Sequence, residues 1–267
     1  MDSGIPLVPV LPPELERIIF LHAVHNDIKN VRNYLVVAKR VRDWLMRAVF
    51  EVMILHPTCP KEFSLDELKK YGHHVQHLLL YTWNNPITAA EYLTSCPNIV
   101  DLALWIGMYT SDTIQALSHL PLKRLSIDLP QLSEPHIYIL TPELITVFSN
   151  VTHLDIANAI SVWAHCEALV HFRVLTHLAV FSSTEVDIFR MILDRVEGLK
   201  VVIWLSGSDL GVDREETPEG IPGEIQDDRV VGLECSYVED WEDGARGEED
   251  MWTIAEKIVE ARWAQNP

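Results

Sequence analysis

The sequence has few basic residues and few cysteines, and each scarcity argues against a class of protein. Lys and Arg total 21 against 39 Asp and Glu, so the formal net charge is −18. We expect neither nucleic acid nor a membrane as partner, because an acidic chain is repelled by phosphate-rich surfaces. The 4 cysteines form no Cys-x-x-Cys pair and no basic leader opens the sequence. We therefore expect reduced thiols in a cytoplasmic or nuclear protein.

Long hydrophobic runs and catalytic motifs are also missing. No apolar run approaches the ~20 residues of a membrane-spanning helix. The chain has no phosphate-binding glycine loop, no His-Glu-x-x-His motif and no Gly-x-Ser-x-Gly motif. Neighbouring strands hold side chains ~4.8 Å apart, too far for histidines of one column to converge on zinc. We expect no catalytic residue, no cofactor and no metal, and hence no enzyme.

The acidic residues are concentrated in one late segment. Residues 209–250 carry 16 Asp and Glu against 3 Arg, and they also contain several glycines and prolines. Such a mixture buries little apolar surface and favours exposed loops. The sequence therefore predicts two acidic loops, at about 209–229 and 239–250, on either side of a short strand.

An apolar pattern recurs along the chain at intervals of about two dozen residues. Each copy reads apolar-x-x-apolar-x-apolar, as in Leu122-Lys-Arg-Leu125-Ser-Ile127. The copies begin at Val75, Ile99, Leu122, Val151, Leu175, Leu199 and Val230, with a fainter copy at Val49. Seven copies at spacings of 23 to 31 residues indicate a repeat architecture rather than chance.

The alternation within each copy predicts a β-strand whose fourth and sixth positions face the core. Apolar periodicity between the copies predicts helices at about 87–93, 114–120, 144–148, 162–172 and 186–196. One strand and one helix cannot bury their apolar side alone, so the units must stack. The pattern resembles leucine-rich repeats over about residues 49–236. The resemblance implies an α/β solenoid, in which a curved parallel sheet carries helices on its convex side.

The third, fifth and seventh positions of each copy should form the concave face of this sheet. The expected target-binding residues on it are Tyr81, Trp105, Arg124, His153, His177 and Phe181. Exposed aromatic side chains with an arginine among polar neighbours are typical of a protein-binding patch. An alternative interpretation is that the N-terminal residues or inserted loops, at about 129–140 and 206–229, cover this face.

The C-terminal residues predict a helix at about 249–265 with many apolar side chains. An open end of a solenoid exposes apolar side chains, so we expect this helix to cap the last repeat. The repeat domain would then span residues 49–267, after a separate module of residues 1–48.

The module of residues 1–48 shows the pattern of three short helices. Pro13 suits the first turn of a helix because its φ is already fixed. The expected inner stripe of this helix consists of Leu15, Ile18, Ile19 and Ala23. Pro12 and Phe20 lie off the stripe and would be exposed unless a partner, the first repeat or residues 1–10 cover them. Three such helices have little core of their own, so they should pack on the repeats or on another chain.

This N-terminal pattern resembles the F-box, a short helical motif that opens Leu-Pro-x-Glu-Leu-Leu-x-x-Ile-Phe. The matching residues are Leu11, Pro12, Glu14, Leu15, Ile19 and Phe20, and residues 37–42 match its later part loosely. Glu16 stands where the family usually has Leu, and Val41 replaces an aromatic residue. The resemblance implies docking to a Skp-family adaptor and, through it, to a cullin. The residues carried over as adaptor-binding are Leu11, Pro12, Leu15, Ile19, Phe20 and Val37.

The two resemblances together imply a substrate receptor of a Skp–cullin–F-box ubiquitin ligase, whose repeats bind an unknown target protein. An alternative is a leucine-rich-repeat scaffold whose F-box-like helices are only a structural cap. A third hypothesis is an enzyme or GTPase regulator built on the solenoid, in which Arg124 acts in trans.

Overall fold

The structure is a computed structural model that describes residues 11–26, 30–56, 64–82, 86–128, 142–158, 167–181, 184–206 and 225–265. The chain falls into two units, residues 1–51 and 52–267, and each is described by itself. The loops expected at 129–140 and, for most of its length, at 206–229 lie outside the described residues. The division after residue 51 is close to the boundary expected after residue 48.

The N-terminal unit contains the three helices α1 (Pro13–Asn26), α2 (Val31–Leu35) and α3 (Lys39–Glu51). Its buried core consists of Val24, Val31, Val41 and Leu45, with Phe20, Leu21 and Tyr34 packed partly buried against it. The rings of Phe20 and Tyr34 meet edge to face with centroids 6.2 Å apart. This core is small, as expected for three short helices.

The inner stripe predicted for α1 is wrong. Leu15, Ile18 and Ile19 are exposed, while Phe20, Leu21 and Val24 face the other helices. The helix carries apolar residues on more than one side, and periodicity alone does not say which side meets the core. Packing against α2 and α3 determines which side of α1 is buried.

The C-terminal unit is built on a single sheet of eight parallel strands in sequential order. The strands are β1 (Val52–Leu55), β2 (His77–Thr82), β3 (Asp101–Ile106), β4 (Arg124–Ile127), β5 (His153–Ile156), β6 (His177–Phe181), β7 (Val201–Ser206) and β8 (Val230–Glu234). Sequential order means that each strand pairs with the next one along the chain. This is the arrangement that stacked strand–helix units predict.

The register of the six central strands agrees with the repeat alignment. The fourth-position residues pair across the sheet in one row, Leu78, Leu102, Leu125, Leu154, Leu178 and Val202. All six side chains are buried. The alternation of apolar residues therefore assigned the two faces of these strands correctly.

The register expected for the two outer strands is wrong. In β1, Met53 rather than Val52 pairs with Leu78 and is buried. In β8, Val230 takes the place expected for Leu233, because Val202 pairs with Val230. A shift by an odd number of residues exchanges the two faces of a strand. In each outer strand two neighbouring apolar residues, Val52 and Met53 in β1 and Val230 and Val231 in β8, point to opposite faces, so the sequence does not specify one register.

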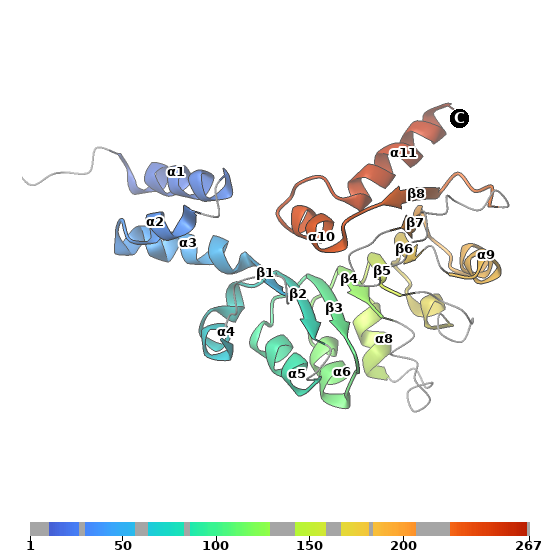
Figure 1. Ribbon diagram of the computed structural model, residues 1–267, viewed down its shortest axis with the longest axis horizontal. Helices are drawn as coiled ribbons and strands as arrows, with labels where there is room; N and C mark the ends of the chain where they lie inside the picture. The colour runs from blue at the N-terminus through green and yellow to red at the C-terminus, as the bar shows by residue number, and fades with distance from the viewer. Residues whose placement is uncertain are drawn as a thin grey trace, which may run out of the picture. The chain divides into compact units, whose positions relative to one another are not determined.

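Helices and 3₁₀ turns between the strands form a layer on one face of the sheet (Figure 1). The described elements are α4 (Leu65–Tyr71), η2 (Gly72–His74), α5 (Pro86–Ser95), α6 (Ser111–Ser118), α8 (Pro142–Phe148), η4 (Glu167–His171) and α9 (Val186–Arg195). Ser64 is the N-cap of α4 and forms a capping box with Glu67. This Ser-x-x-Glu signal was available in the sequence, but no helix was predicted here. Of the helix predicted at 162–172, the described part is a 3₁₀ turn.

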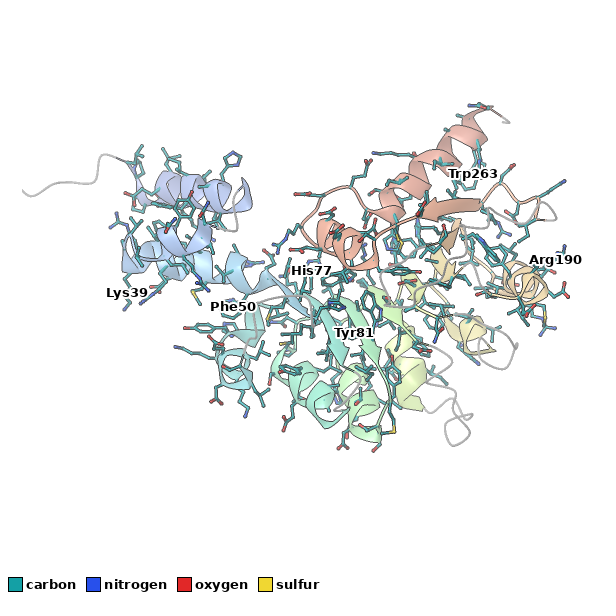
Figure 2. All side chains as sticks on the ribbon, viewed as in Figure 1. Lys39, Phe50, His77, Tyr81, Arg190 and Trp263 are labelled. Atoms are coloured by element: carbon teal, nitrogen blue, oxygen red, sulfur yellow. The ribbon has the colours of Figure 1, made fainter. Side chains whose placement is uncertain are left out.

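The opposite face of the sheet is covered by two C-terminal helices, α10 (Tyr237–Ala245) and α11 (Met251–Gln265). Figure 1 shows them across the sheet from α5 and α6, and Figure 2 shows side chains filling the space on both faces. The acidic loop predicted at 239–250 is therefore wrong over most of its length. Tyr237, Trp241 and Ala245 recur every four residues and are buried, which outweighs the acidic residues between them.

Candidate functional site

The N-terminal unit exposes an unusual number of large apolar side chains. We call the N-terminal apolar surface the group Leu11, Leu15, Ile18, Ile19, Val36 and Val37. Ile18 is 61% exposed and Val36 is 83% exposed. Three of these residues lie on α1, Leu11 comes just before it, and the last two form the turn between α2 and α3. Grouped exposed apolar side chains in so small a unit are typical of a surface that binds a partner.

The residues predicted to bind an adaptor are mostly on this surface. Leu11, Pro12, Leu15, Ile19 and Val37 are exposed. Phe20 is partly buried against the unit's core, so the expectation that it lies open is wrong. Ile18 and Val36 belong to the surface but were not among the predicted adaptor-binding residues. Ile18 could have been found, because it lies three residues after Leu15 and next to Ile19.

The sheet face opposite the helix layer is covered, so the expectation of an open concave surface is wrong. Trp105 is only 5% exposed, and its Nε1 donates a hydrogen bond to Ser126 Oγ at 2.9 Å. Tyr237 of α10 packs on two of the three predicted aromatic residues, edge to face on Trp105 and stacked on Phe181. Tyr81, half-buried, packs at the edge of the same cluster. The cover comes from the C-terminal helices, which were expected only as an end cap or a loop.

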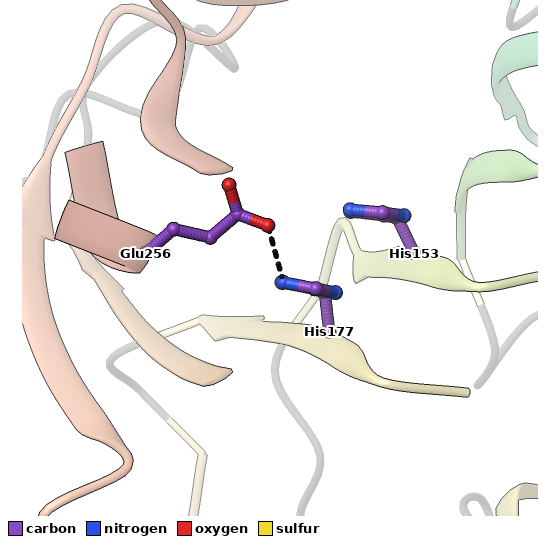
Figure 3. Close-up of side chains that lie close together, drawn as sticks. All are labelled: His153, His177 and Glu256. Carbon is purple, nitrogen blue, oxygen red and sulfur yellow. Dashed lines mark ion pairs between the residues drawn. The ribbon is translucent and has the colours of Figure 1, made fainter. Parts of the chain in front are cut away.

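The two predicted histidines lie together under α11. His153 and His177 are register partners on β5 and β6, and their rings stack with centroids 4.1 Å apart and planes 6° apart. Trp252 meets both rings edge to face. His177 Nε2 lies 2.9 Å from a carboxylate oxygen of Glu256 (Figure 3). Burial, with the neighbouring His177 and Arg124, lowers the pKa of His153 to about 3.

Arg124 is engaged within the protein rather than presented to a partner. Its guanidinium pairs with Asp250, directly before α11, and lies 3.4 Å from an oxygen of Asp101. Both carboxylates are buried. Burial tends to raise the pKa of Asp250, but the Thr253 N–H and Arg124 outweigh it and hold this pKa below its usual value. Arg124 thus ties α11 to β3 and β4.

A small cavity of about 20 Å³, with room for about one water molecule, lies between the sheet and helices α10 and α11. Its walls include Asp155 and Tyr237, and the Oδ1 of Asp155 and the hydroxyl of Tyr237 have no hydrogen-bond partner among the described residues. Burial raises the pKa of Asp155 to about 7, although a hydrogen bond from Ser126 opposes the rise. Burial also raises the pKa of Asp240, another wall residue, to about 6. A cavity of this size suits water rather than a substrate.

The geometry brings together four of the six residues predicted to bind a target, Arg124, His153, His177 and Trp105, but as an internal interface. Their partners, Tyr237, Asp250, Trp252 and Glu256, were not predicted as site residues. These partners lie 75 to 132 residues away in the sequence, so no local pattern could have connected them. Target binding by these residues stays a prediction, and it requires α10 and α11 to leave the sheet.

No protein-family model and no curated protein matches the chain. None of the helices in the described ranges combines the length and apolar character needed to cross a membrane.

Proposed function

We propose that this protein is the substrate-receptor subunit of a Skp–cullin–F-box ubiquitin ligase, acting in the cytoplasm or nucleus. In this proposal the N-terminal apolar surface docks a Skp-family adaptor, which joins the protein to a cullin. The C-terminal unit holds the target protein, and the chain itself catalyses no reaction. The observation that carries the proposal is the exposure of six large apolar side chains within residues 11–37.

The exposed side chains coincide with the residues on which the F-box resemblance depends. Leu11, Leu15 and Ile19 belong both to the motif and to the N-terminal apolar surface. Folding the unit does not bury them, so their apolar character has no role in the unit's own core. Covering them with a partner would remove apolar surface from water and favour association. The helical unit also contains Val41 in its core, so the aromatic residue usual in the family is not needed there for packing.

The cover on the sheet face changes where a target can bind. Since α10 and α11 occupy the predicted target-binding face, an open concave surface is not available while they are in place. We therefore propose that target binding either displaces these helices or uses the outer surface of the C-terminal unit. The adaptor part of the proposal does not depend on this choice.

The test measures binding of the full chain to a purified Skp-family adaptor. Wild-type protein is compared with the double variant Ile18→Glu/Ile19→Glu, which places two charges on the N-terminal apolar surface. The control is Asn33→Glu, an exposed position on α2. We expect wild type and control to co-elute with the adaptor and the double variant to bind about tenfold more weakly or worse. Because all altered side chains are exposed, the circular dichroism of the three proteins should be alike.

Two results would contradict the proposal. Absence of a complex between wild type and adaptor at micromolar concentrations would favour the scaffold alternative, with the three helices as a structural cap. Equal binding by wild type and the double variant would show that the adaptor docks on residues outside the N-terminal apolar surface.

A further inference from the structure

Three possible metal ligands converge where α11 crosses the sheet. The donor atoms of His153, His177 and Glu256 all lie within 4.8 Å of one another. Two imidazoles come from neighbouring strands in the same register, and the carboxylate comes from one turn beyond Trp252 on the covering helix. Figure 3 shows Glu256 reaching toward the two stacked rings. The sequence predicts no metal, because strands alone hold histidines too far apart; the third possible ligand comes from α11, which only the fold brings to the strands.

The imidazoles are oriented from behind by threonine hydroxyls. His153 Nδ1 lies 2.9 Å from Thr152 Oγ1, and His177 Nδ1 lies 2.8 Å from Thr176 Oγ1. Thr152 Oγ1 also donates to the Lys123 carbonyl at 3.1 Å, and Thr176 Oγ1 to the Thr152 carbonyl at 3.3 Å. A hydroxyl has one proton, so when it goes to a carbonyl the imidazole must donate its Nδ1–H. That tautomer leaves a lone pair on each Nε2, as metal-bound histidines require.

One of the three donor atoms has no partner in the described part of the chain, and the other two face each other. Among the described residues, His153 Nε2 has no hydrogen-bond partner. In the same tautomer, His177 Nε2 and the Glu256 carboxylate oxygen bring two lone pairs within 2.9 Å. Two acceptors at this distance repel each other unless a proton or a cation lies with them. A cation bound to both atoms would remove this repulsion.

We propose that His153 Nε2, His177 Nε2 and the Glu256 carboxylate bind Zn²⁺, with water as the fourth ligand. Two imidazoles and a carboxylate suit Zn²⁺, whereas Mg²⁺ and Ca²⁺ prefer oxygen ligands only. Zinc bonds of about 2.0–2.2 Å in a tetrahedron require donors roughly 3.3 Å apart. Glu256 is 43% exposed at its side chain, so it can move to close the remaining distance. The two stacked rings, whose planes are 6° apart, must turn toward each other for both Nε2 lone pairs to point at one ion.

The charges around the site are balanced enough to accept a cation. Arg124 and Lys200 act on the histidines as positive charges. Asp101 and Asp250 oppose them, and both lie within an ion-pair distance of Arg124. Bound zinc would link α11 to β5 and β6, so it would stabilise the cover on the sheet. None of these residues belongs to the N-terminal apolar surface, so a test of the zinc site does not decide the adaptor proposal, and the reverse also holds.

The test uses the full chain after treatment with a chelator. Zn²⁺ affinity is measured by competition with a chromophoric chelator, and the visible absorption of added Co²⁺ reports the coordination. Wild type is compared with Glu256→Gln and His177→Gln. The matched control is Glu260→Gln, which removes an exposed carboxylate one turn further along α11. Because Glu256 is half-exposed, Glu256→Gln should fold like wild type, even if substitution of the buried His177 disturbs folding.

We expect wild type and Glu260→Gln to bind one Zn²⁺ more tightly than Glu256→Gln and His177→Gln by about 10–100-fold. Their Co²⁺ complexes should show the intense visible bands of a four-coordinate site, and Zn²⁺ should raise their Tm. Equal Zn²⁺ affinity in wild type and Glu256→Gln would overturn the proposal, because binding would then come from the acidic surface. Weak, six-coordinate Co²⁺ bands in wild type would overturn it as well.

Discussion

Arg124 sits between two buried carboxylates, Asp101 and Asp250, that belong to different parts of the fold. Removing its guanidinium would leave both carboxylates buried without their cation, and breaking a buried pair in this way is costly. We expect Arg124→Ala to lower the free energy of unfolding by about 3 kcal/mol, measured by urea denaturation near pH 7. The control Arg173→Ala removes an exposed arginine and should cost less than about 0.5 kcal/mol.

The same variant bears on the hypothesis that Arg124 acts in trans on a partner. An arginine held for that role should be dispensable for folding, so an unfolding free energy equal to that of wild type would contradict the structural role assigned here.

The raised pKa of Asp240 predicts that the free energy of unfolding depends on pH. Burial and the nearby Asp250 charge raise its pKa from 3.8 to about 6 in the folded protein. Between these two values the unfolded chain loses the proton first, so the free energy of unfolding falls as pH rises. Asn at this position can still accept the hydrogen bond that Asp240 receives from the Met251 N–H. We expect Asp240→Asn to be about 1 kcal/mol more stable than wild type at pH 7.5, a value reduced because Asp240 is partly exposed.

This advantage should disappear near about pH 3, below both pKa values, where both states of wild type hold the proton. Urea denaturation at the two pH values measures it, with Glu239→Gln, an exposed neighbour, as control. A gain of equal size at both pH values would show that the effect is not due to titration of Asp240.

At the scale of elements, substitutions on α11 test whether α10 and α11 cover the sheet. Trp252 is 6% exposed and packs on His153 and His177, whereas Trp263 on the last turn of α11 is 46% exposed (Figure 2). We expect Trp252→Ala to cost about 3–4 kcal/mol of unfolding free energy and Trp263→Ala less than about 1 kcal/mol. Thermal and urea denaturation of the two variants measure the difference. Equal, small costs would mean that α11 does not lie on the sheet in solution.

Helix positions and strand positions were predictable to different degrees. The six central strands were predicted in the correct register, because an apolar residue, aliphatic everywhere except at Trp204, recurs at the two core-facing positions. In β1 and β8 apolar side chains occupy both faces, and the alternation carries no preference between registers. For α10 the acidic composition suggested a loop, yet the buried Tyr237 and Trp241 stabilise a helix. Side chains that must be buried outweigh the average polarity of a segment.

At the scale of the whole molecule, the two units differ in their capacity to fold alone. Residues 52–267 contain the complete eight-stranded sheet with helices on both faces. Among the described residues of the N-terminal unit, the buried core cluster contains four side chains, and so small a core does not support a stable independent domain. We expect residues 52–267 to unfold cooperatively when expressed alone and residues 1–51 to be largely unfolded, as measured by circular dichroism. A cooperative thermal transition in the isolated N-terminal peptide would contradict this expectation.

Local sequence by itself determined that this protein stacks parallel strands in chain order, since an apolar pattern of fixed period can be buried only by neighbouring copies of itself. It also determined the three N-terminal helices and the apolar residues that α1 carries. Only the tertiary structure decided which side of α1 stays exposed, and that the C-terminal helices fold back over the sheet. It alone brought Glu256 to His153 and His177. These contacts join residues far apart in the chain, and periodicity describes only neighbours within one element.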